Sequence, residues 1–381
     1  MTSSLRQAAG SLLVVGLADK ELSPMERAWL KLIRPAGIIL YRRNIADAKQ
    51  TRAMLSEAAN YCCSHAPTFV DVEGGTVNRL SVALAPLPSA QAVATAMLRT
   101  GKPALAREHG ELVARAVGAF GFNTSLAPMV DLALPDSSEV LGTRCPAAAP
   151  ADVVNYAHNF LAGLKSRGIT GCGKHFPGLG GGTLDTHVET PAIERPWKAM
   201  WSEDLAPYRE LCAELPIVMM NHAAYPQTPG KMLPASVSNF WIGEVLRKRI
   251  GYRGIVLSDD LEMGGILKFM PIDEAAVAAI RTGSDLVEIC HHPEPILNAF
   301  EALVAEGERS RAFAKLLFER ARGTARLRAK VFPLSAPAAL SERQFETLRT
   351  RIIKFNETIE KIVPRVENAG PAKPPTLVES A

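Results

Sequence analysis

Residues 254–263 read Gly-Ile-Val-Leu-Ser-Asp-Asp-Leu-Glu-Met, an apolar run that ends in two adjacent carboxylates. A short apolar run bounded by polar residues is typical of a strand that is buried on both faces. Seven further runs have this character, and each precedes a stretch long enough for a helix or an extended loop. The predicted strands are residues 12–17, 37–41, 68–71, 124–128, 169–175, 217–222, 254–259 and 286–290.

This alternation predicts an α/β fold built on a parallel sheet, because parallel neighbours need long crossover connections that helices usually supply. Eight such units within 381 residues match the strand number and the length of a (β/α)8 TIM-type barrel. A doubly wound open sheet shows the same alternation and is the structural alternative. We expect one catalytic domain over residues 1–335. Ser23-Pro24 predicts the start of its first long helix, and a core-facing stripe predicts another helix over 103–120.

The C-terminal part of the chain differs from the rest. Within the segment 336–363, apolar residues recur at helical spacing among charges from Ser341 to Val363, which predicts an amphipathic helix. This pattern does not decide whether the helix packs on the barrel or on a partner. Residues 364–381 contain four prolines and few large apolar side chains, so we expect a mobile, proline-rich tail.

The composition is that of a folded globular protein, with 47% hydrophobic and 22% charged residues. A net charge of +4 without a clustered basic stripe argues against a nucleic-acid partner. The apolar run at residues 11–17 is much shorter than the ~20 residues of a membrane span, and no signal-peptide cleavage pattern follows it. The six cysteines form no Cys-x-x-Cys pair, which indicates a reducing compartment and no zinc site. We expect a cytoplasmic monomer that needs neither a metal nor another cofactor.

Polar side chains gather where the predicted strands end. In a barrel, the loops after the C-terminal ends of the strands build the active site. Solvation of a strand end explains any one of these positions, but their repetition favours a shared site. The residues are Asp71 and Glu73, Lys174 and His175, Asn221 and His222, Asp259 and Asp260, and His291 and His292.

The most unusual stretch is residues 171–187, Gly-Cys-Gly-Lys-His-Phe-Pro-Gly-Leu-Gly-Gly-Gly-Thr-Leu-Asp-Thr-His. Its glycines allow a loop to move and to approach a ligand closely, but they lack the order of a phosphate-binding P-loop. At its end, Asp185 and His187 are two residues apart. A carboxylate on one imidazole nitrogen fixes the tautomer and raises the basicity of the other nitrogen, which suits a general acid/base. A turn-forming aspartate beside an exposed histidine is the alternative.

A carboxylate at the tip of an apolar strand is well placed to act as a nucleophile or as an electrostatic stabiliser. Asp259 ends the predicted strand 254–259, and Asp260 lies just beyond it. If one of the two faces the pocket, we expect the other to point away and to cap the next helix. The sequence does not choose between them.

Taken together, these pieces resemble the family 3 glycoside hydrolases, in particular their N-acetyl-β-glucosaminidase (NagZ-like) branch. The resemblance covers about residues 10–310. Its strongest element is the run Lys174-His-Phe-Pro-Gly178 followed by Asp185-Thr-His187 at the family's distance. Further motifs follow in the family's order: residues 37–41, 70–79 (Val-Asp-Val-Glu-Gly-Gly-Thr-Val-Asn-Arg), 126–131, 140–144 and 258–261.

The resemblance implies a retaining exo-β-N-acetylglucosaminidase on a barrel scaffold. Asp259 aligns with the nucleophile, and His187 aligns with the acid/base that Asp185 supports. The carbohydrate substrate implied is a GlcNAc-containing muropeptide fragment from cell-wall recycling. The resemblance gives five residues that hold the sugar, and we add His222 at the end of the strand 217–222; the set is Asp71, Arg79, Arg144, Lys174, His175 and His222.

Leu179 departs from the family, which has a histidine there, and Gly181-Gly182 replace a polar pair. Closure of the loop is therefore expected to differ. Three alternatives stay open beside another β-glycosidase activity. A neutral Asp–His acid/base does not repel phosphate, which would permit a phosphorylase. The chain would otherwise be a sugar-binding protein without catalysis, or a Schiff-base enzyme that uses Lys174 as its nucleophile.

Overall fold

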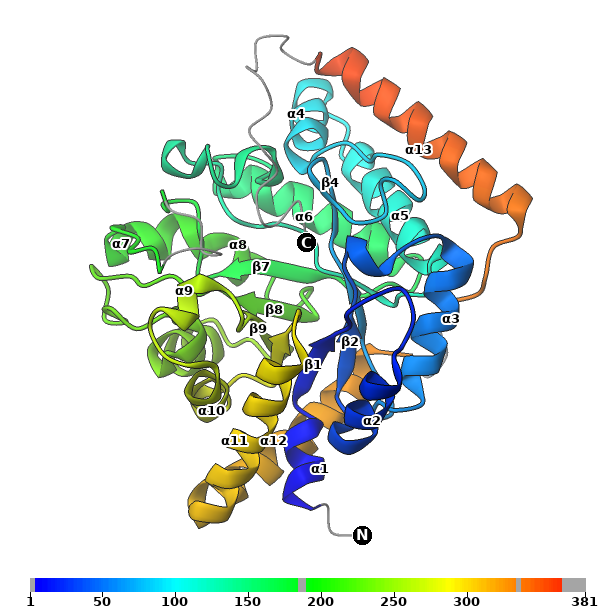
Figure 1. Ribbon diagram of the computed structural model, residues 1–381. Helices are drawn as coiled ribbons and strands as arrows, with labels where there is room; N and C mark the ends of the chain where they lie inside the picture. Colours follow the sequence, from blue (N-terminus) through cyan, green and yellow to red (C-terminus); the bar gives the residue numbers. More distant parts are fainter. Residues whose placement is uncertain (1–3, 184–189, 334–336, 365–381) are drawn as a thin grey trace.

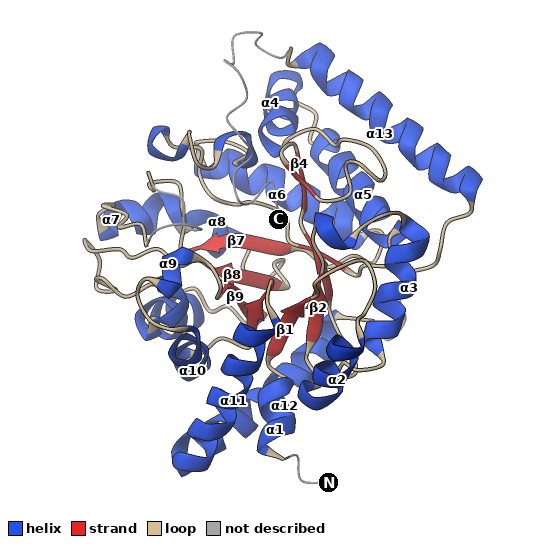
Figure 2. Ribbon diagram, in the orientation of Figure 1, coloured by secondary structure: helices blue, strands red, loops and turns tan. Residues whose placement is uncertain are grey.

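The computed structural model describes residues 4–183, 190–333 and 337–364. Eight parallel strands form the centre, in the order β6-β3-β2-β1-β10-β9-β8-β7 (Figure 2). The ring closes through a bridge between Thr124 and Thr170 and a hydrogen bond from Cys172 N to Ala127 O (2.8 Å). The strands are β1 (Leu13–Gly16), β2 (Gly37–Ile39), β3 (Thr68–Val70), β6 (Thr124–Ser125), β7 (Cys172–Phe176), β8 (Ile217–Met220), β9 (Ile255–Asp260) and β10 (Leu286–Ile289).

Each of the eight predicted runs overlaps one of these strands, and their closure confirms the TIM-type barrel over the open sheet. A short antiparallel pair, β4 (Val72–Gly74) and β5 (Val77–Asn78), follows β3. The sequence did not predict this pair, because strands of two or three residues are too short to show a period.

Helices surround the strands on the outside of the barrel (Figure 1). The predicted start at Ser23 is confirmed: its Oγ accepts from Glu26 N (3.1 Å), and Glu26 Oε2 accepts from Ser23 N (2.8 Å), which caps α2. The helices are α1 (Leu5–Gly10), α2 (Pro24–Ile33), α3 (Ala48–Ala59), α4 (Ala90–Thr100), α5 (Ala104–Ala119), α6 (Pro150–Lys165), α7 (Trp197–Ala199), α8 (Ala206–Glu210), α9 (Gly264–Leu267), α10 (Ile272–Thr282), α11 (Pro293–Arg309), α12 (Arg311–Val331) and α13 (Glu342–Ile362). A π-helical segment, Phe240–Arg249, lies between β8 and β9.

The interior of the barrel is a small apolar core of its own. It contains alternate strand residues such as Phe69 and Leu257, and it includes Phe332 at the end of α12. Because side chains at i and i+2 of a strand share a face, the next interior positions toward the C-terminal ends are polar. Those positions are Tyr41, Asp71, Lys174, Asp259 and Glu288.

Helix α13 is the predicted amphipathic helix, and it packs on α4 and α5 of the barrel's own outer layer (Figure 1). Its buried side chains are Leu348, Ile352, Phe355 and Ile359. The Arg349 Nε donates to the Leu84 carbonyl (2.9 Å), which fixes the helix along this surface. The limits of the predicted units, 1–335, 336–363 and 364–381, stay predictions. None of the helices within the described ranges has the length and apolarity needed to cross a membrane.

Candidate active site

Four charged side chains form a buried cluster at the C-terminal ends of β3 and β7. The Lys174 Nζ lies 2.8 Å from Asp71 Oδ1 and 2.7 Å from Glu73 Oε1. Arg144 donates two hydrogen bonds to the Glu73 carboxylate, at 2.8 and 2.9 Å. Two parallel bonds between a guanidinium and a carboxylate fix both distance and orientation, so the cluster is rigid.

The cluster is fully charged at neutral pH. Burial by itself raises the pKa of Glu73, but the positive charges of Arg144 and Lys174 outweigh burial and lower this pKa to about 2. Burial by itself raises the pKa of Asp71, but the positive charges of Lys174 and Arg79 outweigh burial, so this pKa is lowered. Burial lowers the pKa of Lys174, but Asp71 and Glu73 raise it above its usual value. Two carboxylates hold the Lys174 ammonium, an arrangement that does not favour the uncharged amine that a Schiff-base nucleophile needs.

Asp131 fixes the base of the glycine-rich loop. Its Oδ2 accepts the His175 backbone N–H (2.9 Å) and lies 2.8 Å from His175 Nδ1. Its Oδ1 accepts the Leu179 N–H (2.8 Å). Since a carboxylate accepts, the His175 proton is on Nδ1, and Nε2 is the nitrogen that can meet a sugar hydroxyl.

The loop glycines serve close packing against the protein itself. A Cβ on Gly180 would lie 2.5 Å from the Leu132 carbonyl oxygen, so only glycine fits there. Leu179, which replaces the family's histidine, buries its side chain in the core while Asp131 holds its backbone. The base of this loop is therefore ordered by apolar packing.

Asp185 and His187, the predicted acid/base pair, lie outside the described residues. Beyond that gap the chain reappears at Thr190, whose Oγ1 donates to the Gly265 carbonyl (2.6 Å) in α9. The roles of Asp185 and His187 stay predictions.

The two adjacent aspartates at the end of β9 have different surroundings. Asp260 is buried, its Oδ2 lies 3.2 Å from His291 Nε2, and its Oδ1 accepts the Glu262 N–H (3.0 Å). Asp259 is only partly buried, and its Oδ1 accepts the Asp260 N–H (3.0 Å). Both oxygens of Asp260 are thus engaged, Oδ1 by the chain after β9 and Oδ2 by His291 after β10, whereas Asp259 is the more accessible carboxylate. This difference favours Asp259 where the sequence left the choice open.

His222 supports the same strand end. Its Nε2 lies 3.0 Å from the Asp260 carbonyl oxygen, and its Nδ1 lies 2.8 Å from Ser236 Oγ. Because a carbonyl only accepts, the ring proton is on Nε2, and Nδ1 accepts from the Ser236 hydroxyl. His222 therefore positions the backbone that carries Asp259. Its contact with the substrate stays a prediction.

The chain matches the family model "Glycosyl hydrolase family 3 N terminal domain" over residues 4–320. It belongs to glycosyl hydrolase family 3. A curated β-hexosaminidase of Alkalilimnicola ehrlichii is 37% identical over 289 residues, which are 74% of this chain and 82% of that protein. A β-hexosaminidase of Idiomarina loihiensis is 32% identical over 279 residues, 73% of this chain and 83% of that protein.

Solved structures of family 3 enzymes superpose on the barrel. A family 3 β-N-acetylglucosaminidase from Paenibacillus sp. superposes with a TM-score of 0.81 at 29% sequence identity. The match covers 93% of this chain and 69% of the Paenibacillus chain. NagZ from Neisseria gonorrhoeae has a TM-score of 0.73 at 25% identity and covers 93% of this chain and 98% of its own. The predicted resemblance to the family and to this branch is confirmed, and the chain is a glycoside hydrolase of the β-hexosaminidase type.

The predicted catalytic and substrate-binding set of this family 3 enzyme lacked Asp131 and gave no role to Glu73, which was named only as a polar residue at a strand end. Glu73 bridges Lys174 and Arg144, and Asp131 holds His175. Both are charged residues that closely follow a predicted strand, so the strand-end pattern contained the signal. The Arg79 guanidinium lies 3.9 Å from Asp71, and its contact with the substrate stays a prediction.

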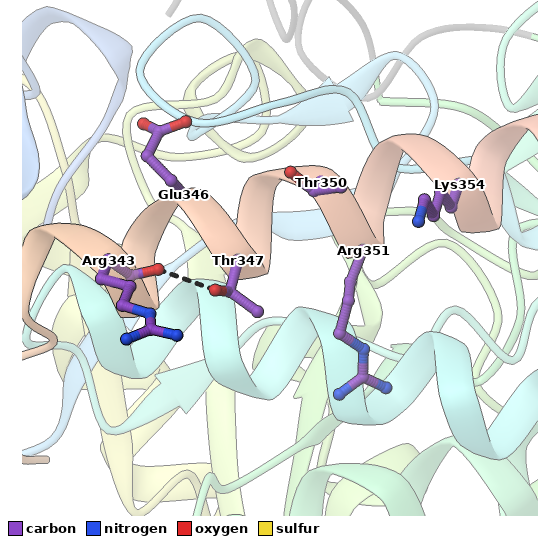
Figure 3. A pocket seen from close by; sticks show the side chains of 6 residues that line it. All are labelled: Arg343, Glu346, Thr347, Thr350, Arg351 and Lys354. Atoms are coloured by element: carbon purple, nitrogen blue, oxygen red, sulfur yellow. Dashed lines mark hydrogen bonds between the residues drawn. The ribbon is translucent and has the colours of Figure 1, made fainter.

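A groove on the outer helix α13 lies apart from this site (Figure 3). Its lining side chains all come from one helix at the periphery of the molecule, and none follows a barrel strand. The groove therefore shares no residue with the candidate site at the strand ends. The groove is lined by Arg343, Glu346, Thr347, Thr350, Arg351 and Lys354.

Proposed function

We propose that this family 3 enzyme is a retaining exo-β-N-acetylglucosaminidase that removes non-reducing terminal GlcNAc, with Asp259 as the nucleophile. The supporting observation is the contrast at the end of β9, where Asp260 is engaged by His291 and the backbone while Asp259 is accessible. The names of the curated relatives, β-hexosaminidases, support the substrate class.

The reaction proceeds in two steps. In the first, an Asp259 oxygen attacks the anomeric carbon, the bond to the leaving oxygen breaks, and His187 protonates that oxygen. In the second, His187 takes a proton from water, the hydroxyl attacks the anomeric carbon, and the Asp259 carboxylate leaves. Two inversions retain the β configuration. Asp185 holds the His187 ring in the tautomer that both steps need.

The charged cluster holds the sugar before the bond breaks. Lys174 and Arg144 keep their charges at neutral pH, and Asp71 accepts hydrogen bonds from hydroxyl groups while Lys174 fixes its orientation. The His175 Nε2 and the Arg79 guanidinium complete this subsite. Because these groups are already fixed by ion pairs, binding requires little reorganisation of the protein.

The physiological substrate of the proposal is a GlcNAc-β-1,4-anhydro-MurNAc muropeptide fragment, cleaved by a cytoplasmic monomer in cell-wall recycling. Phosphate is the alternative acceptor in the second step, because a neutral imidazole does not repel an anion. A glycosyl phosphate formed in phosphate buffer and absent from a non-nucleophilic buffer would identify a phosphorylase. Equal product profiles in the two buffers support hydrolysis.

The decisive experiment traps the covalent intermediate. A 5-fluoro analogue of N-acetylglucosaminyl fluoride keeps the acetamido group and slows both steps, so that the glycosyl-enzyme accumulates. We expect peptide mapping by mass spectrometry to place one sugar on Asp259. Asp260→Asn is the matched control and should be labelled at the same residue. A label on Asp260, or turnover without any aspartyl adduct, would overturn the assignment. If the wild type does not turn over a chromogenic N-acetyl-β-glucosaminide, the chain is a sugar-binding protein without catalysis.

A further inference from the structure

Glu288 on β10 is a buried acid that the proposed mechanism does not use. Its side chain is 1% exposed, and its Oε1 has no hydrogen-bond partner among the described residues. Its backbone is tied to β9, since Glu288 N donates to Ser258 Oγ (3.0 Å) and Glu288 O accepts the Leu261 N–H (2.9 Å). A buried polar atom without a partner is costly, so its position needs a reason.

Glu288 lies level with the two aspartates at the end of β9. The strand register pairs Leu286 with Leu257 and Glu288 with Asp260, with one extra residue on β9 between them. Leu286 and Cys290 belong to the interior core, and Glu288 stands between them on the same face of β10. Its carboxyl group therefore enters the barrel on the strand next to Asp259.

The groups that face Glu288 are mostly acids. Burial raises its pKa well above the usual value, and the negative charges of Asp259, Asp260 and Asp71 raise it further. Lys174 opposes this effect, but Asp71 and Glu73 already neutralise that cation. The other titratable neighbours, Tyr41, Cys172 and Cys290, have pKa values that burial raises, so they carry no charge at neutral pH.

A protonated Glu288 has one hydrogen to donate, and the neighbouring acids differ in what they can accept. Both oxygens of Asp260 are engaged, by His291 and by the Glu262 N–H. Asp71 is held by Lys174 and faces Arg79. Within the described residues, Asp259 accepts one bond, at Oδ1 from the Asp260 N–H, which leaves Oδ2 as an acceptor.

We propose that Glu288 is a positioning residue whose neutral carboxylic acid donates a hydrogen bond to the Asp259 carboxylate. This inference rests on the proposed role of Asp259. With the Asp260 N–H on one oxygen and Glu288 on the other, the carboxylate has a single orientation toward the sugar. A neutral donor achieves this without placing a second negative charge beside the nucleophile. No proton is transferred, and Glu288 stays protonated through both steps.

The experiment compares Glu288→Leu, which has no donor, with Glu288→Gln, which keeps a neutral donor. Rates are measured against pH with a dinitrophenyl N-acetyl-β-glucosaminide, because this leaving group needs no protonation by His187. We expect Glu288→Leu to lower kcat at least about tenfold with a smaller change in KM. Glu288→Gln should restore most of that rate. The acid limb of kcat/KM, which reports ionisation of the nucleophile, should move to higher pH in Glu288→Leu and stay in place in Glu288→Gln.

The direction in which the acid limb of kcat/KM moves in Glu288→Gln shows whether Glu288 is protonated. An ionised Glu288 would hinder ionisation of Asp259, so Glu288→Gln would then move the acid limb to lower pH by about one unit. That shift, or a Glu288→Leu variant as active as the wild type, overturns the proposal. Should Glu288→Leu not fold, the position of the acid limb in Glu288→Gln decides alone. Trapping of the fluoro sugar on Asp259 in the wild type tests the proposed nucleophile independently of Glu288. A correct label with an unaffected Glu288→Leu variant rejects only the role of Glu288, while a label elsewhere rejects the proposed nucleophile.

Discussion

At the C-terminal end of the barrel, the carboxylates near β3 and β7 are paired with cations, whereas those near β9 and β10 mostly are not. On the β3 and β7 side, Lys174 and Arg144 each contact a carboxylate within 2.8 Å. On the β9 and β10 side, the ion pairs of the described residues give Asp259, Asp260 and Glu288 a single partner, His291. The side with Lys174 and Arg144, which we call the paired side, stays ionised and rigid, and this suits the binding of sugar hydroxyls. We call the side with Asp259, Asp260 and Glu288 the acidic side. On the acidic side, burial and the neighbouring carboxylates raise the pKa of Glu288, and Asp259 is the carboxylate that stays partly accessible.

The largest expected effect comes from removing the reactive carboxylate on the acidic side. Asp259→Asn should lower kcat by about 10⁴-fold or more, because the amide is a poor nucleophile, while the fold remains. Steady-state kinetics with a chromogenic N-acetyl-β-glucosaminide measure it. Asp260→Asn is the matched control and should lose far less, since its side chain can still accept the Glu262 N–H. Equal losses in the two variants would contradict the division of roles between these aspartates.

The second prediction concerns the loss of stability when the ion pairs of the paired side are removed. Lys174→Met leaves Asp71 and Glu73 buried without their shared cation, which should cost about 3–5 kcal/mol of unfolding free energy. Denaturant unfolding measures this loss. Lys248→Met, which removes an exposed pair with Glu244, is the control and should change stability by less than about 1 kcal/mol. If the two variants are equally stable, the buried cluster does not stabilise the fold as its geometry indicates.

The third effect is the acid sensitivity of the paired side. Glu73 has a folded-state pKa of about 2 against an ordinary value of 4.5, so it contributes stability above pH 4.5 that is lost as pH falls toward 2. A shift of this size corresponds to about 3 kcal/mol. Unfolding free energies between pH 3 and pH 7 should therefore fall less steeply in Glu73→Gln than in the wild type. Parallel slopes for the two proteins would show that Glu73 is not held ionised.

Much of this fold follows from local patterns in the sequence. Most barrel strands lie in buried apolar runs that polar residues bound, so composition marks their position, although β6 is Thr-Ser and β7 contains Lys174 and His175. The strand ends also marked Lys174 and Asp259, because a charged residue directly after an apolar run stands out. The partners of these residues were harder to find. Glu73 and Lys174 are far apart in the sequence, and only the circular order of the strands brings them together.

Glu288 shows a different limit of sequence analysis. It lies within the apolar run at 286–290, where a single glutamate resembles an ordinary outward-facing position. Its inward direction follows from its place between Leu286 and Cys290, which the structure puts in the core inside the barrel. The available signal was a charged residue in the middle of a strand predicted to be buried on both faces.

The smallest expected effect is a difference in how stability depends on pH, which has opposite signs for Glu288 and Glu73. The raised pKa of Glu288 means that the folded protein retains a proton that the unfolded chain releases. Its contribution to stability is therefore present below the ordinary value of 4.5 and is lost progressively as pH rises above it. This sign is opposite to that of Glu73. Glu288→Gln does not titrate, so its stability relative to the wild type should rise between pH 5 and pH 8, although burial of the amide reduces the absolute gain. Thermal unfolding at both pH values measures the difference. A Glu288→Gln variant whose relative stability stays level over this range would show that Glu288 is ionised in the folded protein, and the acidic side would then tolerate a third negative charge.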